Sequence, residues 1–180
     1  MSETPTNPEA PPKRTLIAAA ICLAGFQIRN LWLGISHAEI PDGKFRGYSA
    51  DQVEEFFRQI AAGPRGLNGV PLFGWWGVSL DTMFPVVVAL LVVWGLRHVF
   101  RWVPWPFLAV MPTVFVLLDW CENVTLARVA WSFQPPNLTP DQAALVPFAS
   151  LCTQGKWTAL GTTLLAMLLG AIFRRHRTTP

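Results

Sequence analysis

Five ionisable side chains interrupt the long apolar stretches of this sequence. Two are cations and three are carboxylic acids: Arg29, Asp81, Asp119, Glu122 and Lys156. Asp119, Glu122 and the adjacent Asn123 are spaced i, i+3, i+4, which places their side chains on one face of a helix. Charges within apolar segments are costly, so they usually face a protein interior or a wet cavity and pair with one another. We therefore expect these six residues to gather in one cluster.

Several chemistries are open to such a cluster. Paired carboxylates with a lysine can perform general acid–base catalysis or bind a polar headgroup, and the two cations can balance the acids or hold an anionic headgroup. A divalent metal between the three acids would find no histidine ligand except the loop residue His37. No serine or cysteine has an evident histidine partner at this level, which argues against nucleophilic catalysis. We therefore predict no metal and no cofactor, and we assign no catalytic residue.

The same residues also fit a purely structural role. Lipid offers no hydrophobic drive for helix association, so polar pairs can hold transmembrane helices together. Side chains near the membrane edge can instead reach water. An ion path is disfavoured, because 86–96 and 164–173 contain almost no polar residues. Three interpretations stay open: a tie between helices, a ligand or substrate site, or exposure at the interface.

The composition is that of a membrane protein. Of the 180 residues, 52% are hydrophobic and 14% are charged, whereas about a quarter of a soluble domain is charged. Apolar runs predict four spans, at about 15–35, 72–96, 103–124 and 148–173. The sequence therefore predicts an all-α, four-helix transmembrane bundle at 15–177, preceded by a Pro-rich, disordered tail at 1–14. A cleaved signal peptide is the alternative for the first run, but its apolar character continues beyond Asn30.

Two capping-box patterns mark helix starts outside these runs. Ser49 and Gln52 precede apolar residues at helical spacing, which predicts an amphipathic helix at about 50–62 within a long first loop. This helix is expected to lie over the bundle or on the lipid interface; the alternative is a lid over a membrane cavity. Thr139 and Gln142 predict a helix from about Pro140, whose first turns stand outside the membrane before the last span.

Clusters of basic residues flank the predicted spans on one side. They are Lys13, Arg14, Arg97, Arg101, Arg174, Arg175 and Arg177. The positive-inside rule makes that side cytoplasmic, so we expect both termini in the cytoplasm and the first loop outside it. At about 1.5 Å per residue, the five charged residues lie about 22 to 31 Å beyond these flanks, in the outer leaflet. Short basic clusters do not form the basic stripe of a nucleic-acid surface, so we predict no nucleic-acid partner.

The three cysteines are too few for a disulfide scaffold. Cys121 and Cys152 reach similar heights, and a bond between them on an oxidising face is the alternative to the favoured interpretation as buried thiols. Cys22 lies deep in the first span and is interpreted as a packing residue.

The second predicted helix opens with Asp-x-x-Phe-Pro at 81–85, and the third closes with Asp-x-x-Glu-Asn at 119–123. Both patterns, with the loop segment 47–53, resemble those of a group of small four-helix proteins of the bacterial inner membrane. The resemblance implies a multi-pass protein of that membrane, and it brings no established activity with it. The layout is also similar to the four-helix domain of sterol isomerases and the sigma-2 receptor in size, helix count, a long first loop and an acidic residue opening the second helix. That likeness is an analogy of fold alone.

These observations favour a membrane protein whose outer-leaflet charged pocket binds a lipid-like amphiphile or a partner protein. The ligand-binding candidates are Arg29, Asp81, Asp119, Glu122, Asn123 and Lys156. One alternative is a membrane enzyme with isomerase-like acid–base chemistry on a lipid substrate, and another is a structural membrane subunit. The lipid bilayer is the expected environment in every case.

Overall fold

A computed structural model of the chain describes residues 13–35 and 40–178, without the side chains of 42 and 175–178. All of the long elements in these ranges are helices. Within these ranges the α-helices are α1 (Lys13–Leu33), α2 (Ala50–Ala62), α3 (Gly69–Val99), α4 (Trp105–Ser132) and α5 (Pro140–Thr178), with 3-10 turns η2 (Pro41–Gly43) and η3 (Gly66–Asn68). All of the α-helices except α2 are long and apolar enough to cross a membrane. The prediction of an all-α, four-helix transmembrane fold is confirmed, and the chain is a multi-pass membrane protein. Most of the predicted tail, residues 1–12, and His37 lie outside the described residues.

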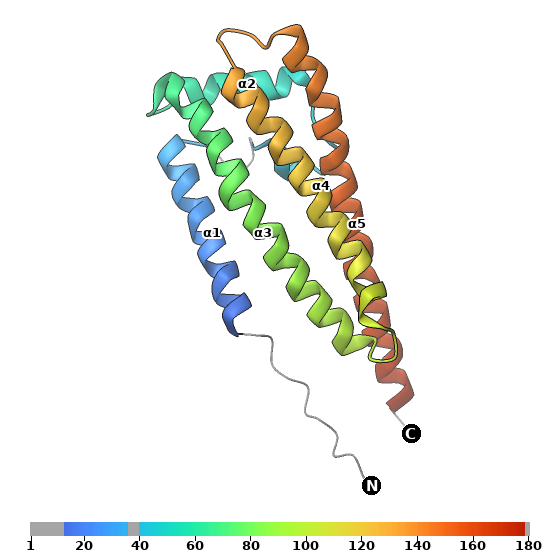
Figure 1. Cartoon of the computed structure of the whole chain (residues 1–180). Coiled ribbons are helices and arrows are strands. Elements are labelled where there is room, and N and C mark those ends of the chain that lie inside the picture. The colour runs from blue at the N-terminus through green and yellow to red at the C-terminus, as the bar shows by residue number, and fades with distance from the viewer. Residues whose placement is uncertain (1–12, 36–39, 179–180) are drawn as a thin grey trace.

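The four long helices form a bundle with one peripheral member. Helix α4 packs along both α3 and α5, and α1 packs against α3 (Figure 1). The start of α1, the turn between α3 and α4, and the end of α5 lie at one end of the bundle (Figure 1). Pro85 lies inside α3 and Pro112 inside α4; transmembrane helices tolerate such prolines because neighbouring groups satisfy the freed backbone.

Helix α2 crosses the opposite end of the bundle (Figure 1). Its capping box forms as predicted: the Gln52 N–H donates to Ser49 Oγ at 3.3 Å, and the Ser49 N–H donates to Gln52 Oε1 at 3.0 Å. One face of α2 is buried, and the Phe56 ring meets the Phe73 ring of α3 edge-on at 5.1 Å between centroids. The helix at 50–62 therefore lies over the bundle end and closes an apolar core there.

Each long helix extends beyond its predicted span at one end or both. The third span was expected to end near 124, but α4 continues to Ser132. It continues because Leu126, Val129 and Ala130 are buried in the same apolar core as α2, so this part of the helix packs on protein. Helix α5 begins at Pro140, where the second capping box forms through Thr139 and Gln142. Helix α1 begins at Lys13, within the segment predicted as tail.

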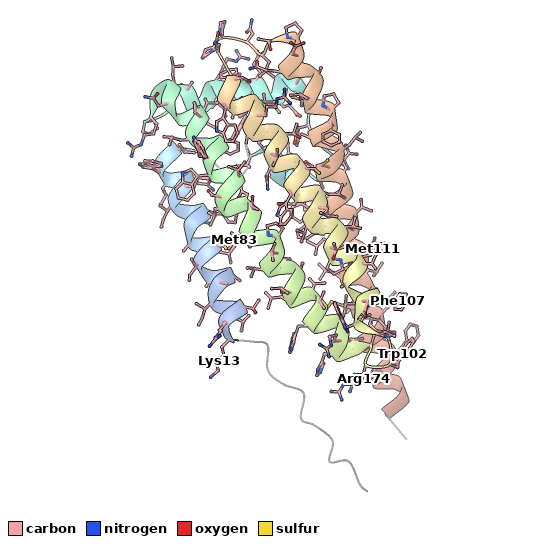
Figure 2. All side chains as sticks on the ribbon, viewed as in Figure 1. Lys13, Met83, Trp102, Phe107, Met111 and Arg174 are labelled. Atoms are coloured by element: carbon pink, nitrogen blue, oxygen red, sulfur yellow. The ribbon has the colours of Figure 1, made fainter. Side chains whose placement is uncertain are left out.

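Large apolar side chains cover the outside of the bundle. Met83, Phe107 and Met111 point outward from α3 and α4 (Figure 2), and Phe107 is 72% exposed. Exposed apolar surface on this scale marks a surface that contacts lipid or protein. Lys13 and Arg174 lie at the end of the bundle where α1 starts and α5 ends (Figure 2). The interior is where polar side chains gather.

Candidate functional site

An ion triad joins α4 to α5. The Lys156 ammonium lies 2.7 Å from Asp119 Oδ1 and 2.7 Å from Glu122 Oε2. Lys156 is 1% exposed and Glu122 is fully buried, so neither can exchange its partner for water. Asp119 and Glu122 reach one lysine because their i, i+3 spacing puts both on the face of α4 that meets α5. Lys156 therefore pairs with both carboxylates, and its contact with Glu122 Oε2 is an ion pair without a hydrogen bond.

A second ion pair joins α1 to α3. Arg29 Nη1 donates to Asp81 Oδ2 at 2.9 Å, and Arg29 Nε donates to Asn30 Oδ1 at 3.1 Å. The guanidinium carbon also lies 5.1 Å from the centre of the Phe26 ring and 5.5 Å from that of Phe73. Aromatic faces attract cations within about 6 Å. Arg29 is thereby fixed in orientation by a carboxylate, an amide and two rings.

Asn123 connects the two groups of charges. Its side-chain amide donates to Asp119 Oδ2 at 2.8 Å and lies 3.4 Å from the backbone carbonyl of Asp81. The six predicted residues thus form one polar cluster, called here the charge cluster, that runs from α1 through α3 and α4 to α5. The structure brings together all of the residues that the sequence singled out. It also ties the four long helices to one another.

Two further residues bind Glu122 from outside the predicted set. The Tyr48 hydroxyl donates to Glu122 Oε1 at 3.1 Å, and Thr153 Oγ1 donates to the same oxygen. Thr153 precedes Lys156 by three positions, so the shared helix face was a usable signal. Tyr48 precedes α2, and nothing in its spacing indicates that it reaches α4. The first loop therefore contributes a side chain to the charge cluster.

We predict that Tyr48 resists ionisation in the folded protein. Burial, and then the charge of Glu122, raise the pKa of Tyr48 above its ordinary value, which is about 10. The folded state then binds the proton more tightly, so the contribution of Tyr48 to stability is complete below about pH 10 and is lost as pH rises above that. Tyr48 is the only tyrosine, so tyrosinate absorbance in an alkaline titration reports on it alone. Denatured protein should titrate near pH 10 and folded protein above it; coincident curves would contradict the buried contact.

A pocket of about 220 Å³ lies beside the charge cluster, between α1, α3 and the η2 segment. It is lined by Leu23, Phe26, Gln27, Arg29, Ile40, Gly43, Asp81, Phe84 and Asp119. Three of the six predicted residues, Arg29, Asp81 and Asp119, therefore line this α1–α3 pocket. The other three, Glu122, Asn123 and Lys156, do not line it. The sequence did not separate these two groups, because both lie at the same height along their helices.

The formal charges of the cluster do not cancel. Two cations face three carboxylic acids, and each cation is already within 3 Å of a carboxylate oxygen. Asp81 uses Oδ2 for Arg29, and its Oδ1 accepts no hydrogen bond from the described part of the chain. The pocket therefore presents an acceptor oxygen and two carboxyl groups, beside apolar walls from Leu23, Phe26 and Phe84. Such a site suits a donor or cation attached to an apolar group.

Within the described residues, the geometry shows neither a metal site nor a disulfide bond. No group of three or more His, Cys, Asp or Glu side chains there is arranged to hold a metal ion. Cys22, Cys121 and Cys152 are free thiols, so the alternative of a Cys121–Cys152 bond is not seen. Cys121 is exposed and not buried as interpreted.

No protein-family model matches the sequence, and no curated protein or solved structure is significantly similar to it. The resemblance of the motifs at 81–85 and 119–123 to bacterial membrane proteins therefore stays a prediction. Function has to be inferred from the charge cluster and the α1–α3 pocket.

Proposed function

We propose that this multi-pass membrane protein binds an amphiphile with a cationic head, such as a long-chain amine. The head would meet Asp81 and Asp119 in the α1–α3 pocket, and the apolar chain would follow the outside of α1 and α3 into the bilayer. The observation that carries the proposal is the composition of the pocket wall, which joins Arg29, Asp81 and Asp119 to Leu23, Phe26 and Phe84.

The size of the pocket supports a headgroup and not a whole lipid. At about 220 Å³ it falls below the roughly 300–1,000 Å³ of pockets that enclose a drug-sized molecule. An alkyl chain would have to leave the pocket. The exposed apolar side chains around it, such as Leu23 at 54% and Met83 at 63%, offer that chain a surface continuous with lipid.

The charge of the cluster supports a cation over an anion. Arg29 and Lys156 are both engaged by carboxylates, so an anionic head would have to displace one of them and leave that carboxylate unpaired. Leaving a buried polar group without its partner costs about 1–3 kcal/mol, and more for a charged group. A cationic head needs no such exchange and brings the cluster toward neutrality.

We also propose which membrane the protein occupies and how the bundle is oriented in it. The basic end of the bundle, with Lys13, Arg97, Arg101 and Arg174, would face the cytoplasm of a bacterial cell, as the positive-inside rule requires. Helix α2 and the α1–α3 pocket would then lie toward the outer face of the inner membrane. Membership of the bacterial family with the Asp-x-x-Phe-Pro and Asp-x-x-Glu-Asn motifs is part of the same proposal.

Native mass spectrometry of the protein in mild detergent tests the binding. Tetradecylamine should add to the wild type with one molecule per chain, and tetradecanol should bind about tenfold more weakly or worse. A hydrogen bond to a charged group contributes about 1.5–3 kcal/mol, and about 1.4 kcal/mol corresponds to a factor of ten. Equal binding of the amine and the alcohol would contradict a role for the carboxylates.

A matched pair of glycine variants locates the site. Gly43 lines the pocket, and a Cβ added there meets no atom within 4 Å, so Gly43→Phe should fold and occupy the pocket. Gly161 on the exposed side of α5 has the same free space and lies away from the pocket, so Gly161→Phe is the control. The amine adduct should be lost from Gly43→Phe alone. Retention of the adduct by both variants would place the amine elsewhere.

A further inference from the structure

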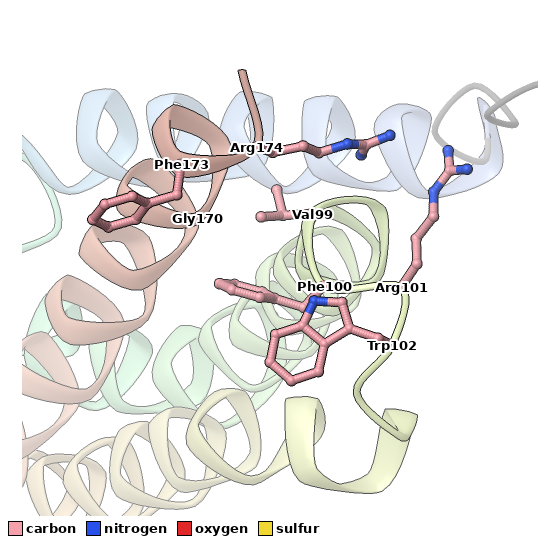
Figure 3. A pocket seen from close by; sticks show the side chains of 7 residues that line it. All are labelled: Val99, Phe100, Arg101, Trp102, Gly170, Phe173 and Arg174. Carbon is pink, nitrogen blue, oxygen red and sulfur yellow. The ribbon is translucent and has the colours of Figure 1, made fainter. Parts of the chain in front are cut away.

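A second pocket, of about 460 Å³, lies at the end of the bundle opposite α2. It is formed by the end of α3, the turn that follows, and the end of α5 (Figure 3). Its lining residues are Val99, Phe100, Arg101, Trp102, Gly170, Phe173 and Arg174. This basic pocket has the volume of a site that encloses a small molecule, about 300–1,000 Å³. It contains no acidic side chain and shares no residue with the charge cluster.

The two arginines of the basic pocket extend toward the same side of it (Figure 3). Arg174 Nη1 donates to the backbone carbonyl of His98 at 2.7 Å, which holds the side chain against the end of α3. Arg101 is exposed and lies in the turn between α3 and α4. Guanidinium groups bind phosphate through paired, charge-assisted hydrogen bonds, so two of them beside one cavity are suited to a phosphate.

Aromatic rings complete the basic pocket. Phe100 and Trp102 lie next to each other, 6.2 Å apart between ring centres, and Phe173 lies across the pocket on α5 (Figure 3). Trp102 is 80% exposed. Tryptophan and arginine at the end of transmembrane helices are typical of the level of lipid headgroups. The rings therefore add apolar surface to the pocket that the two arginines line.

A glycine allows α5 to approach this site. A Cβ added at Gly170 would lie 2.7 Å from Val99 Cγ1 and would also meet the Phe100 ring. Contacts below 3.0 Å require one of the partners to move. Glycine at this position therefore brings Phe173 and Arg174 close enough to Arg101 to enclose a common space.

We propose that the basic pocket binds the phosphate of an anionic phospholipid, with the arginines on the phosphate and the rings against the glycerol and the first part of the acyl chains. Basic pockets between transmembrane helices at the cytoplasmic level bind such headgroups, and anionic lipids are drawn to that surface. The proposal rests on the orientation proposed above, with the basic end of the bundle in the cytoplasm. It is independent of what occupies the α1–α3 pocket.

Native mass spectrometry with added lipid tests the proposal. Dimyristoyl phosphatidylglycerol should bind the wild type about tenfold more tightly than dimyristoyl phosphatidylcholine, whose choline neutralises the phosphate. Arg101→Gln/Arg174→Gln should lose that preference, by about tenfold in affinity for the anionic lipid. Arg101→Gln alone, at an exposed position, should lose part of it with the fold intact.

Two exposed arginines at the α2 end provide the control. Arg46→Gln/Arg128→Gln removes the same charge and should keep the preference. An equal loss in this control would mean that net charge and not the pocket attracts the lipid, which overturns the proposal. Inorganic phosphate should not displace the lipid; displacement at millimolar phosphate would identify a site for the free anion instead. Equal binding of the two lipids by the wild type also overturns it.

Discussion

Replacing Lys156 by methionine is expected to lower the free energy of unfolding by about 3–5 kcal/mol. Lys156 is the single cation shared by Asp119 and Glu122, at 2.7 Å from each. Methionine keeps most of the volume and removes the charge, so two carboxylates would remain buried with no cation between them. Removing one partner of a buried ion pair is costly for that reason, although the intact pair itself adds little stability. Unfolding in detergent micelles, followed by circular dichroism, measures the loss.

Two comparisons separate this effect from loss of charge in general. Lys13→Met, at an exposed position at the start of α1, should change stability by less than about 0.5 kcal/mol. Lys156→Met/Asp119→Asn/Glu122→Gln removes the unpaired charges too and should recover much of the loss. If Lys156→Met unfolds like the wild type, the triad does not hold α4 to α5.

Replacing Phe57 by alanine is expected to destabilise the protein by about 3–5 kcal/mol. Phe57 is fully buried, with ring centres 5.4 Å from Phe133 and 6.1 Å from Phe73. It is the largest completely buried side chain of the core between α2 and the bundle. Truncation leaves a cavity that the long helices cannot close, because their positions are fixed by the charge cluster.

The lipid-facing Phe107 provides the control for this variant. Phe107→Ala removes the same ring at a position that is 72% exposed, so it should change stability little. Hydrogen exchange should show that Phe57→Ala first releases α2, while the amides of α3 and α4 stay protected. Uniform loss of protection in all helices would mean that α2 does not form a separately packed cap.

The helix content and the members of the charge cluster could be predicted from the sequence for a common reason. Apolar helices that cross a membrane have a known rise per residue, so counting from the basic flanks gives each charge a height. Arg29, Asp81, Asp119 and Lys156 meet because charges at one height in lipid have no other partners. The i, i+3, i+4 spacing of Asp119, Glu122 and Asn123 then fixed which face of α4 is polar.

Contacts that depend on the path of a loop could not be predicted from the sequence. Tyr48 reaches Glu122 because the first loop folds back over the bundle. There, the backbone N–H of Tyr48 donates to Ser150 Oγ of α5 at 2.9 Å. The end of α4 at Ser132 was missed for the same reason. Hydropathy indicates where a helix leaves the lipid, but it does not show that the helix continues because it packs against α2. The division of the cluster into pocket-lining and enclosed residues requires the rotation of each helix, which height alone does not give.

Photoaffinity labelling tests the central claim, that the α1–α3 pocket binds an amphiphile by its polar end. The probe is a long-chain amine with a diazirine in its alkyl chain, applied to the wild-type protein in detergent micelles and mapped by peptide mass spectrometry. Labels should concentrate on α1 and α3 near Leu23, Phe26 and Phe84, and excess tetradecylamine should remove them. Labelling spread over lipid-facing residues of α5 such as Leu165, with no effect of the competitor, would contradict the claim.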